Sequence, residues 1–537
     1  MTKVLVDRNG VIDSKHTELF QKIINYCEKN YKLRLTDIRA HILPLDQLSE
    51  MVATSGFTRA PQTWQLMQEY LKIKRQKELG NITIFEMVSA AGGILTKKNE
   101  TLDYTDVYIF DQDTSIIKKL VMAHSLGHVH MLTNNVFNIR ARKRAGYYSP
   151  QTAMMELTDM VERMYENKGG ERTTKLIDAM EVISSIVAVG VDDFSEMDKV
   201  IEKAEEERVH ERKSIWQEAE TPFEDKIRRL LPKKNAGLFP DRRVNNIFYI
   251  LEKTQRLDDD EKELVHAYRM MFQYKHGLIP ETKITHEGFS ALLDLRFGQE
   301  CSEIVPDWEM REYIKHRTEG MEHIREINPY GLGFKLLHDI MMRQAQGEYG
   351  QEYESITKGY ERLKALKKPD KEKGWEKVLE VVESCNDYNL ISQHFDERHF
   401  RTYARDLYAS QVEEWESWFQ GRLYVEQIIS KEFEDVKNAL LFHQVNNGRP
   451  LFYVPLGGAN FIGVGQILIH HEIDPLIKQF SLERKVLTLD VESVEAVLKA
   501  IVVFTKRPVH LKTVDEDGKD IYITYNGIKF SETELKR

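Results

Sequence analysis

The spacing of apolar residues constrains the fold of this chain more than any other feature. From residue 15 to about residue 440 they recur mostly at intervals of three or four, as at Met154, Leu157 and Val161. This is the period of an amphipathic helix. We therefore predict a mainly helical N-terminal domain. Two apolar runs within it, Ile82–Ser89 and Asp106–Phe110, fit either short strands or buried helical segments, because periodicity alone does not separate the two.

The pattern changes after Phe442, where short runs rich in Val, Ile and Leu predict strands. These runs are Leu451–Val454, Ile467–His470, Val486–Leu489, Ala500–Phe504 and Ile521–Tyr525. A turn containing Gly518 between Val509–Thr513 and Ile521–Tyr525 indicates a hairpin. We expect two domains, a helical one over residues 1–410 and a small α+β one over residues 411–537, the latter with one leading helix.

Composition narrows the class of protein. The 537 residues include 76 Lys plus Arg and 86 Asp plus Glu, a net charge of -10, which disfavours binding to nucleic acid. Asp192–Asn235 is dense in charge and is expected to be an exposed helix or linker. Three widely separated cysteines indicate no disulfide framework. Mean hydropathy is -0.48, and neither a signal peptide nor a membrane span is expected, so we predict a cytoplasmic protein.

A pair of histidines is the first candidate for chemistry. His124 and His128 are four residues apart, so on a helix both imidazoles face the same way and can reach one ion. This is the geometry of the H-E-x-x-H zinc helix. A polar core helix with hydrogen-bonded histidines is the alternative.

Glu287 is the candidate third ligand. Residues 285–291, Thr-His-Glu-Gly-Phe-Ser-Ala, resemble the N-E-G-F-A motif of metallo-aminopeptidases, in which the glutamate completes the zinc site. Two imidazoles and one carboxylate leave a fourth position for water. The alternative for Glu287 is an acidic residue stabilised by a helix N-terminus.

One position departs from the zinc-helix pattern. The residue after His124 is Ser125, where H-E-x-x-H enzymes have the glutamate that accepts a proton from water. A serine hydroxyl is not a base near neutral pH. Any hydrolysis then needs another carboxylate, and we predict Glu162 and Glu166, which share a face of the following helix.

Several motifs in order resemble the stage V sporulation protein R (SpoVR) family. Residues 124–135 are similar to its H-V-Y-G-H-x-D-F-F-x-N-N segment, although His130 stands where an aspartate is common. Glu287 and Gly288 match its M-N-E-G-W-A motif. Three further segments resemble N-P-Y-x-L-G-F, F-L-S-Q-Y-L and R-P-V-H-L, respectively: Asn328–Phe334, Leu390–Phe395 and Arg507–Leu511.

The resemblance implies a fold class and a function. We expect a mainly α N-terminal domain with zincin-like metal-site helices and a small α+β C-terminal domain. The expected function is a zinc-dependent hydrolase of peptide or peptidoglycan-related substrates, linked to the spore cortex. Alternatives are a non-catalytic metal-binding or interaction protein, and a di-iron protein using the Glu207/His210 or Glu263/His266 spacing. The glycines near residue 460 match no phosphate loop, so no nucleotide is predicted.

Overall fold

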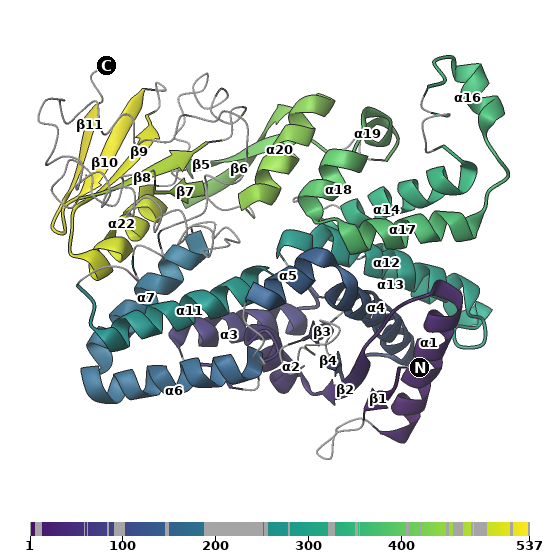
Figure 1. Ribbon diagram of the computed structural model, residues 1–537, viewed down its shortest axis with the longest axis horizontal. Coiled ribbons are helices and arrows are strands. Elements are labelled where there is room, and N and C mark those ends of the chain that lie inside the picture. Colours follow the sequence, from purple (N-terminus) through teal and green to yellow (C-terminus); the bar gives the residue numbers. More distant parts are fainter. Residues whose placement is uncertain are drawn as a thin grey trace, which may run out of the picture. The chain divides into compact units, whose positions relative to one another are not determined.

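The computed structural model describes most of the helical region and much of the C-terminal region (Figure 1). The described residues are 2–5, 13–57, 59–61, 63–82, 85–90, 103–144, 150–186, 247, 251, 256–277, 280–319, 328–348, 353, 355–403, 407–417, 421–446, 451–454, 466–473, 476, 479, 491–515 and 519–534.

The chain forms two compact units that alternate along the sequence. Unit 1 comprises residues 1–170 and 267–444, and unit 2 comprises residues 171–266 and 445–537. Residues 259–266 of helix α11 (Asp259–Gly277) are assigned to unit 2, and residues 267–277 are assigned to unit 1. The apolar pattern of the sequence instead predicted a single division, between residues 410 and 411, and that domain division stays a prediction.

Unit 1 contains a four-stranded sheet. Its order is β1 (Val4–Leu5), β2 (Asp37–Leu43), β4 (Tyr104–Phe110) and β3 (Glu86–Ser89). The first three strands are parallel, and β3 is antiparallel to β4. The two ambiguous apolar runs therefore form strands, β3 and β4, and β2 is a further strand in the region predicted to be helical.

Helices cover both faces of this sheet. One face packs on α1 (Ser14–Tyr31) and α4 (Ser115–Asn134) in the main core, to which Ile38, Val107 and Ile109 contribute. The other face carries Tyr108 and Phe110 against α2 (Leu45–Ala53) and α3 (Trp64–Glu78). Because side chains alternate along a strand, each strand residue faces one of these two layers.

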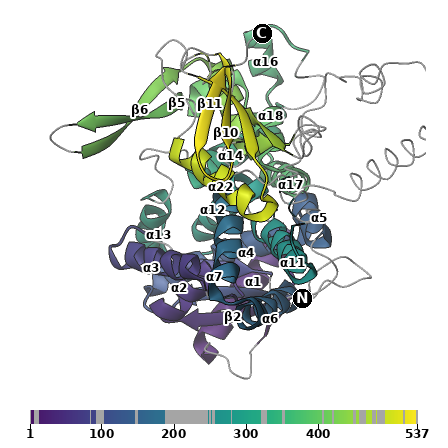
Figure 2. The same cartoon turned by 90° about the vertical axis from the view of Figure 1, so that its left-hand side faces the viewer.

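The remaining elements of unit 1 are helices and one hairpin. The helices are α5 (Val136–Arg144), α6 (Pro150–Lys168), the short 3-10 helix η1 (Pro280–Thr282), α12 (Lys283–Glu300), α13 (Asp307–Glu319), α14 (Pro329–Gln346), α16 (Gly359–Ala365), α17 (Lys371–Ser384), α18 (Asp387–His394), α19 (Glu397–Tyr403) and α20 (Phe433–Asn446). The hairpin pairs β5 (Ala409–Ser417) with β6 (Gly421–Ser430), drawn as a long ribbon in Figure 2.

Three helices, α4, α12 and α14, pack backbone to backbone. A Cβ atom on Gly127 of α4 would lie 2.4 Å from Ser290 Oγ of α12. A Cβ atom on Gly333 of α14 would lie 2.1 Å from the Ile284 carbonyl oxygen of α12. Glycine is therefore needed at both positions, because any side chain would separate the helices. The glycines of the sequence motifs are packing residues that bring the motif-bearing helices together.

Local capping signals fix where these helices begin. Thr114 caps α4 by accepting a hydrogen bond from the Ile117 N–H. Asn328 caps α14 through the Tyr330 and Gly331 N–H groups, and Pro329 occupies the first helical turn.

Unit 2 contains α7 (Gly170–Ile186) and a five-stranded sheet. The strand order is β11 (Phe530–Glu534), β10 (Asp520–Tyr525), β9 (Val509–Val514), β8 (Ile467–Glu472) and β7 (Leu451–Tyr453). The pair β9 and β10 is antiparallel, which confirms the predicted hairpin strands.

One prediction for the C-terminal region was wrong. The run Ala500–Phe504 is part of a helix, α22 (Val491–Thr505), in which Val494, Val497, Leu498 and Ile501 form the buried face. A short apolar segment of a buried helix has the same sequence pattern as a buried strand, which explains the error. The leading helix expected before these strands is present as α20, which precedes β7, although the β5–β6 hairpin comes before it in the chain. The predicted strand Val486–Leu489 lies outside the described residues. No helix in the described part of the chain is long and apolar enough to span a membrane.

Candidate metal centre

The two predicted histidines lie side by side on α4. His124 and His128 are one turn apart, their ring centres are 4.8 Å apart, and both side chains are largely buried. Helix α4 follows β4 directly and runs through the core, which holds both imidazoles away from solvent.

Glu287 reaches both imidazoles from α12. Its Oε2 atom lies 3.5 Å from His124 Nε2 and 3.4 Å from His128 Nε2. The close packing at Gly127 allows α12 to approach α4 this nearly. The structure thus brings together the three side chains predicted as metal ligands, although 158 residues separate Glu287 from His128 in sequence.

A fourth member, Glu86, was missed by the sequence analysis. Its Oε1 atom is 3.6 Å from His124 Nε2, and Glu86, His124 and His128 each offer a ligand atom within 4.8 Å of the others. Glu86 pairs with Ile109 across β3 and β4, so its side chain faces the main core, as Ile109 does. The sequence feature that could have identified Glu86 was its position as a carboxylate on the apolar face of a predicted strand.

His124 has a charged partner behind it. Its Nδ1 atom lies 2.7 Å from Asp294 Oδ2 of α12, and Arg317 of α13 donates to the same carboxylate oxygen at 2.8 Å. All three side chains are almost completely buried. The Asp294 carboxylate can accept a hydrogen bond from His124 Nδ1–H, and the other ring nitrogen, Nε2, lies on the side of Glu86 and Glu287.

The buried charges shift several pKa values. Burial raises the pKa of Glu86 to about 7. Burial also lowers the pKa of His124, but Glu86, Asp294 and Glu287 outweigh it and raise that pKa to about 9. For Glu287 burial is the largest influence and opposes ionisation, yet the two histidines hold its pKa well below its usual range. The cluster therefore favours positive charge at its centre.

The structure does not bring Glu162 and Glu166 to this cluster. Both are exposed on α6, and Glu162 pairs with Arg59 at 2.8 Å. Glutamates on an exposed helix face are stabilised by solvent and by such surface pairs. Their catalytic role stays a prediction, and Glu86 is the better-placed carboxylate.

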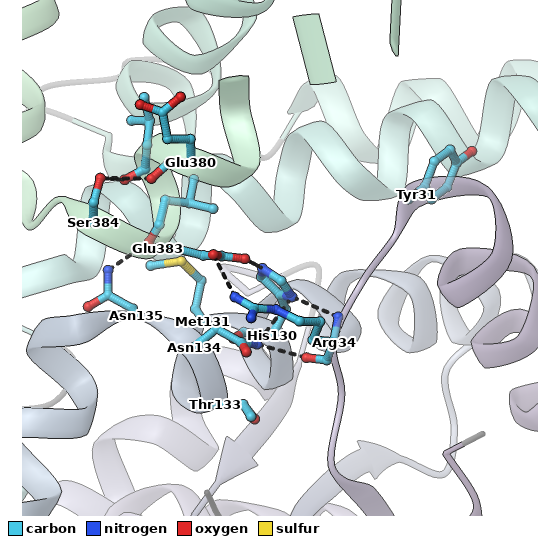
Figure 3. A network of polar contacts seen from close by, with 12 residues as sticks. Tyr31, Arg34, His130, Met131, Thr133, Asn134, Asn135, Glu380, Glu383 and Ser384 are labelled. Carbon is cyan, nitrogen blue, oxygen red and sulfur yellow. Dashed lines mark hydrogen bonds and ion pairs between the residues drawn. The ribbon is translucent and has the colours of Figure 1, made fainter. Parts of the chain in front are cut away.

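His130 and Ser125 also lie on α4. His130 Nδ1 accepts from the Arg34 N–H at 3.2 Å, and its Nε2 lies 3.2 Å from Glu383 of α17, as Figure 3 shows. Arg34 also contacts Glu383 at 2.6 Å. His130 therefore ties α17 to the segment before β2 and is engaged away from the cluster. Ser125 is buried, and its hydroxyl has no hydrogen-bond partner among the described residues.

Asn135, which ends the histidine-containing motif, stabilises the fold. Asn135 accepts hydrogen bonds from the Phe137 and Asn138 N–H groups at the start of α5. Its amide nitrogen donates to the carbonyl oxygens of Val382 and Cys385 at the end of α17. Figure 3 shows Asn135 beside α17. This motif residue joins three helices.

The di-iron alternative gains no support from the described residues. Glu263 and His266 are both exposed on α11 and do not point into a helical bundle. Glu207 and His210 lie outside the described residues.

Comparison with known families identifies the family to which this chain belongs. A family model described as SpoVR like protein matches residues 13–449. The chain belongs to the SpoVR family. This confirms the resemblance predicted from the motifs, and the match contains every residue of the cluster. It ends before Arg507–Leu511, so the similarity there is not part of it. No curated protein and no solved structure gives a significant match.

Proposed function

We propose that this SpoVR-family protein binds one divalent metal ion, with zinc as the expected ion, through His124, His128 and Glu287. The spacing of the ligand atoms carries this proposal. In a tetrahedral site with ligands about 2.0–2.2 Å from zinc, neighbouring ligand atoms lie roughly 3.3–3.6 Å apart. The two histidine nitrogens lie 3.5 and 3.4 Å from Glu287 Oε2. These gaps are long for hydrogen bonds and suitable for ligands that share an ion.

Unsatisfied polar atoms and charge support the same proposal. His124 Nε2, Glu86 Oε2 and Glu287 Oε2 are buried without hydrogen-bond partners among the described residues, and buried polar atoms rarely remain so. Glu86, Glu287 and Asp294 provide three carboxylates against the single guanidinium of Arg317. When all are ionised the cluster carries two net negative charges, which a divalent cation would neutralise.

We further propose that the protein is a hydrolase of amide bonds. A divalent cation held by two imidazoles and one carboxylate would polarise a carbonyl group and acidify a water molecule at the fourth position. Glu86, whose Oε1 atom lies 3.6 Å from His124 Nε2, would accept the proton of the attacking water and return it to the leaving nitrogen. Ser125 is not required for either transfer.

The proposed substrates are peptides, including cell-wall stem peptides. The third-ligand motif around Glu287 resembles that of peptidases, and the name of the family connects it with sporulation, in which cortex peptidoglycan is made. Both arguments are analogies, so they define which substrates to test first.

The test combines metal analysis with hydrolysis of a peptide panel. We expect about one zinc per chain in the wild type and a loss of zinc in His124→Ala and Glu287→Gln. Glu86→Gln should keep the metal and lose roughly 10²–10⁴-fold in hydrolysis rate, the usual effect of removing a general base. Glu156→Gln, at another exposed glutamate of α6 that has no proposed role, is the matched control and should retain both properties.

Other outcomes would revise the proposal in defined ways. Loss of zinc in Glu86→Gln would make Glu86 a metal ligand. Zinc binding without hydrolysis of any peptide would favour the non-catalytic metal-binding alternative. A folded wild type that binds no divalent metal would refute the metal site itself.

A further inference from the structure

Helix α16 exposes two large apolar side chains. Figure 1 shows α16 standing apart from α14 and α17, between which it lies in the sequence. Tyr360 is 57% exposed and Leu363 is 72% exposed. They are three residues apart on the helix, so they share a face. Apolar side chains that lie together on an exposed surface indicate an interaction site more often than single ones do.

The segment that follows α16 is attached to the end of α14. The Lys367 N–H donates to the Gln346 carbonyl oxygen, and the Asp370 N–H donates to the Ala345 carbonyl oxygen, both at 2.9 Å. Both acceptors lie in the last turn of α14. These backbone hydrogen bonds fix the base of the protruding segment, so α16 is presented from a defined position on unit 1.

The surroundings of the two apolar side chains are cationic. Residues 358–368 contain four Lys and one Arg against a single carboxylate, that of Glu361, so they carry a net charge of +4 in a chain whose net charge is -10. All four lysines are exposed: Lys358, Lys364, Lys367 and Lys368. Glu361 lies 3.5 Å from Lys358 Nζ, and no described carboxylate pairs with the other three. The Lys364 ammonium lies 5.6 Å from the centre of the Tyr360 ring. This surface is suited to an anionic partner.

The residue types favour a lipid surface over a protein. Protein interfaces are enriched in Arg and depleted of Lys, because the planar guanidinium makes directed, bidentate hydrogen bonds. The one arginine here, Arg362, is engaged within the segment, where its Nε donates to the Ile356 carbonyl oxygen at 2.6 Å. Lysines instead attract anionic lipid headgroups as point charges, and their long apolar stems allow neighbouring side chains to enter the membrane interface.

We propose that α16 docks unit 1 reversibly on an anionic lipid surface. Two apolar side chains, those of Tyr360 and Leu363, enter the headgroup region, and the exposed lysines lie against the lipid phosphates. Two apolar side chains alone give only weak membrane binding, so the attachment needs the lysines as a second contribution. The proposal does not depend on the metal site, because no residue of α16 belongs to that cluster.

The test measures cosedimentation of the full-length protein with lipid vesicles. At low salt we expect binding to phosphatidylcholine vesicles that contain phosphatidylglycerol, no binding to pure phosphatidylcholine vesicles, and weaker binding as salt is added. The triple variant Lys364→Gln, Lys367→Gln, Lys368→Gln should bind roughly 100-fold more weakly, since each lysine contributes about fivefold. Leu363→Ser should bind roughly 10-fold more weakly. Leu79→Ser, at a leucine that is 64% exposed just after α3, is the matched control and should bind as the wild type does.

Three results would overturn the proposal. A wild type that binds phosphatidylglycerol vesicles no better than phosphatidylcholine vesicles would do so, and an acidic protein would then be the favoured partner of α16. Wild-type binding by the triple lysine variant would show that another surface holds the membrane. Equal losses in Leu363→Ser and Leu79→Ser would show that the position on α16 does not matter. All these variants change exposed side chains and should unfold at the wild-type temperature.

Discussion

Replacing Gly333 by alanine should separate the helices that carry the cluster. The new methyl group would lie 2.1 Å from the Ile284 carbonyl oxygen and 2.8 Å from Gly288 Cα. Both atoms belong to the backbone of α12, so neither can rotate away. Relief therefore requires that α14 move away from α12 as a whole, and α12 carries Glu287.

The expected loss in the free energy of unfolding of Gly333→Ala follows from two opposing effects. Overpacking a well-packed core typically costs about 1–3 kcal/mol, and a backbone obstacle places this site at the upper end. Alanine gains about 1 kcal/mol over glycine in helix propensity. The net loss in the free energy of unfolding should be about 1–2 kcal/mol, with weaker zinc binding because Glu287 shifts with α12.

Urea unfolding followed by circular dichroism measures this loss. Gly170→Ala is the matched control, because its methyl group would meet nothing closer than Tyr165 Cδ1 at 3.9 Å. That control should be as stable as the wild type or slightly more so. A Gly333→Ala variant with the wild-type unfolding midpoint and zinc affinity would show that the helices are not in backbone contact.

Three further predictions concern single side chains. Asp294→Asn should weaken zinc binding about 10–100-fold in chelator competition, because His124 loses its carboxylate partner; unchanged affinity would contradict this. Asp387 accepts hydrogen bonds from the Thr285 N–H and hydroxyl at the start of α12. Asp387→Ala should therefore lower the free energy of unfolding in urea by about 1–2 kcal/mol. An unchanged unfolding midpoint would contradict the capping role of Asp387. Burial lowers the pKa of His399 to about 4, whereas the unfolded value is about 6.5. As the pH falls, the unfolded chain therefore binds the proton at a higher pH than the folded chain does. From pH 7 to pH 5 the free energy of unfolding of the wild type should fall by about 2 kcal/mol more than that of His399→Phe. Parallel pH profiles of the two proteins would contradict this.

Local sequence patterns predicted the parts of the site that depend on one element. His124 and His128 needed only helical spacing, and both indeed share a face of α4. Glu287 came from its motif, and the structure places it against both imidazoles. The strands β9 and β10 were predicted for a similar reason, since a turn joined two short β-type segments.

The missed residues depend on contacts distant in sequence. Glu86 reaches the cluster because β3 pairs with β4, and nothing in its four-residue strand specifies that neighbour. In the sequence, Asp294 and Arg317 have the pattern of ordinary charged residues on amphipathic helices. Only the packing of α12 and α13 buries them beside His124. Conversely, Glu162 and Glu166 had helical spacing like that of the histidines, but their helix presents them to solvent. Spacing defines a face and does not say what that face meets.

The central claim is tested most directly by anomalous diffraction at the zinc edge from crystals of the zinc-loaded protein. The account predicts one strong peak about 2.0–2.2 Å from His124 Nε2, His128 Nε2 and Glu287 Oε2. Glu86 should lie beside the fourth position, without replacing it. Crystals with the three side chains arranged as described and no anomalous peak among them would contradict the claim, as would a zinc ion bound elsewhere in the chain.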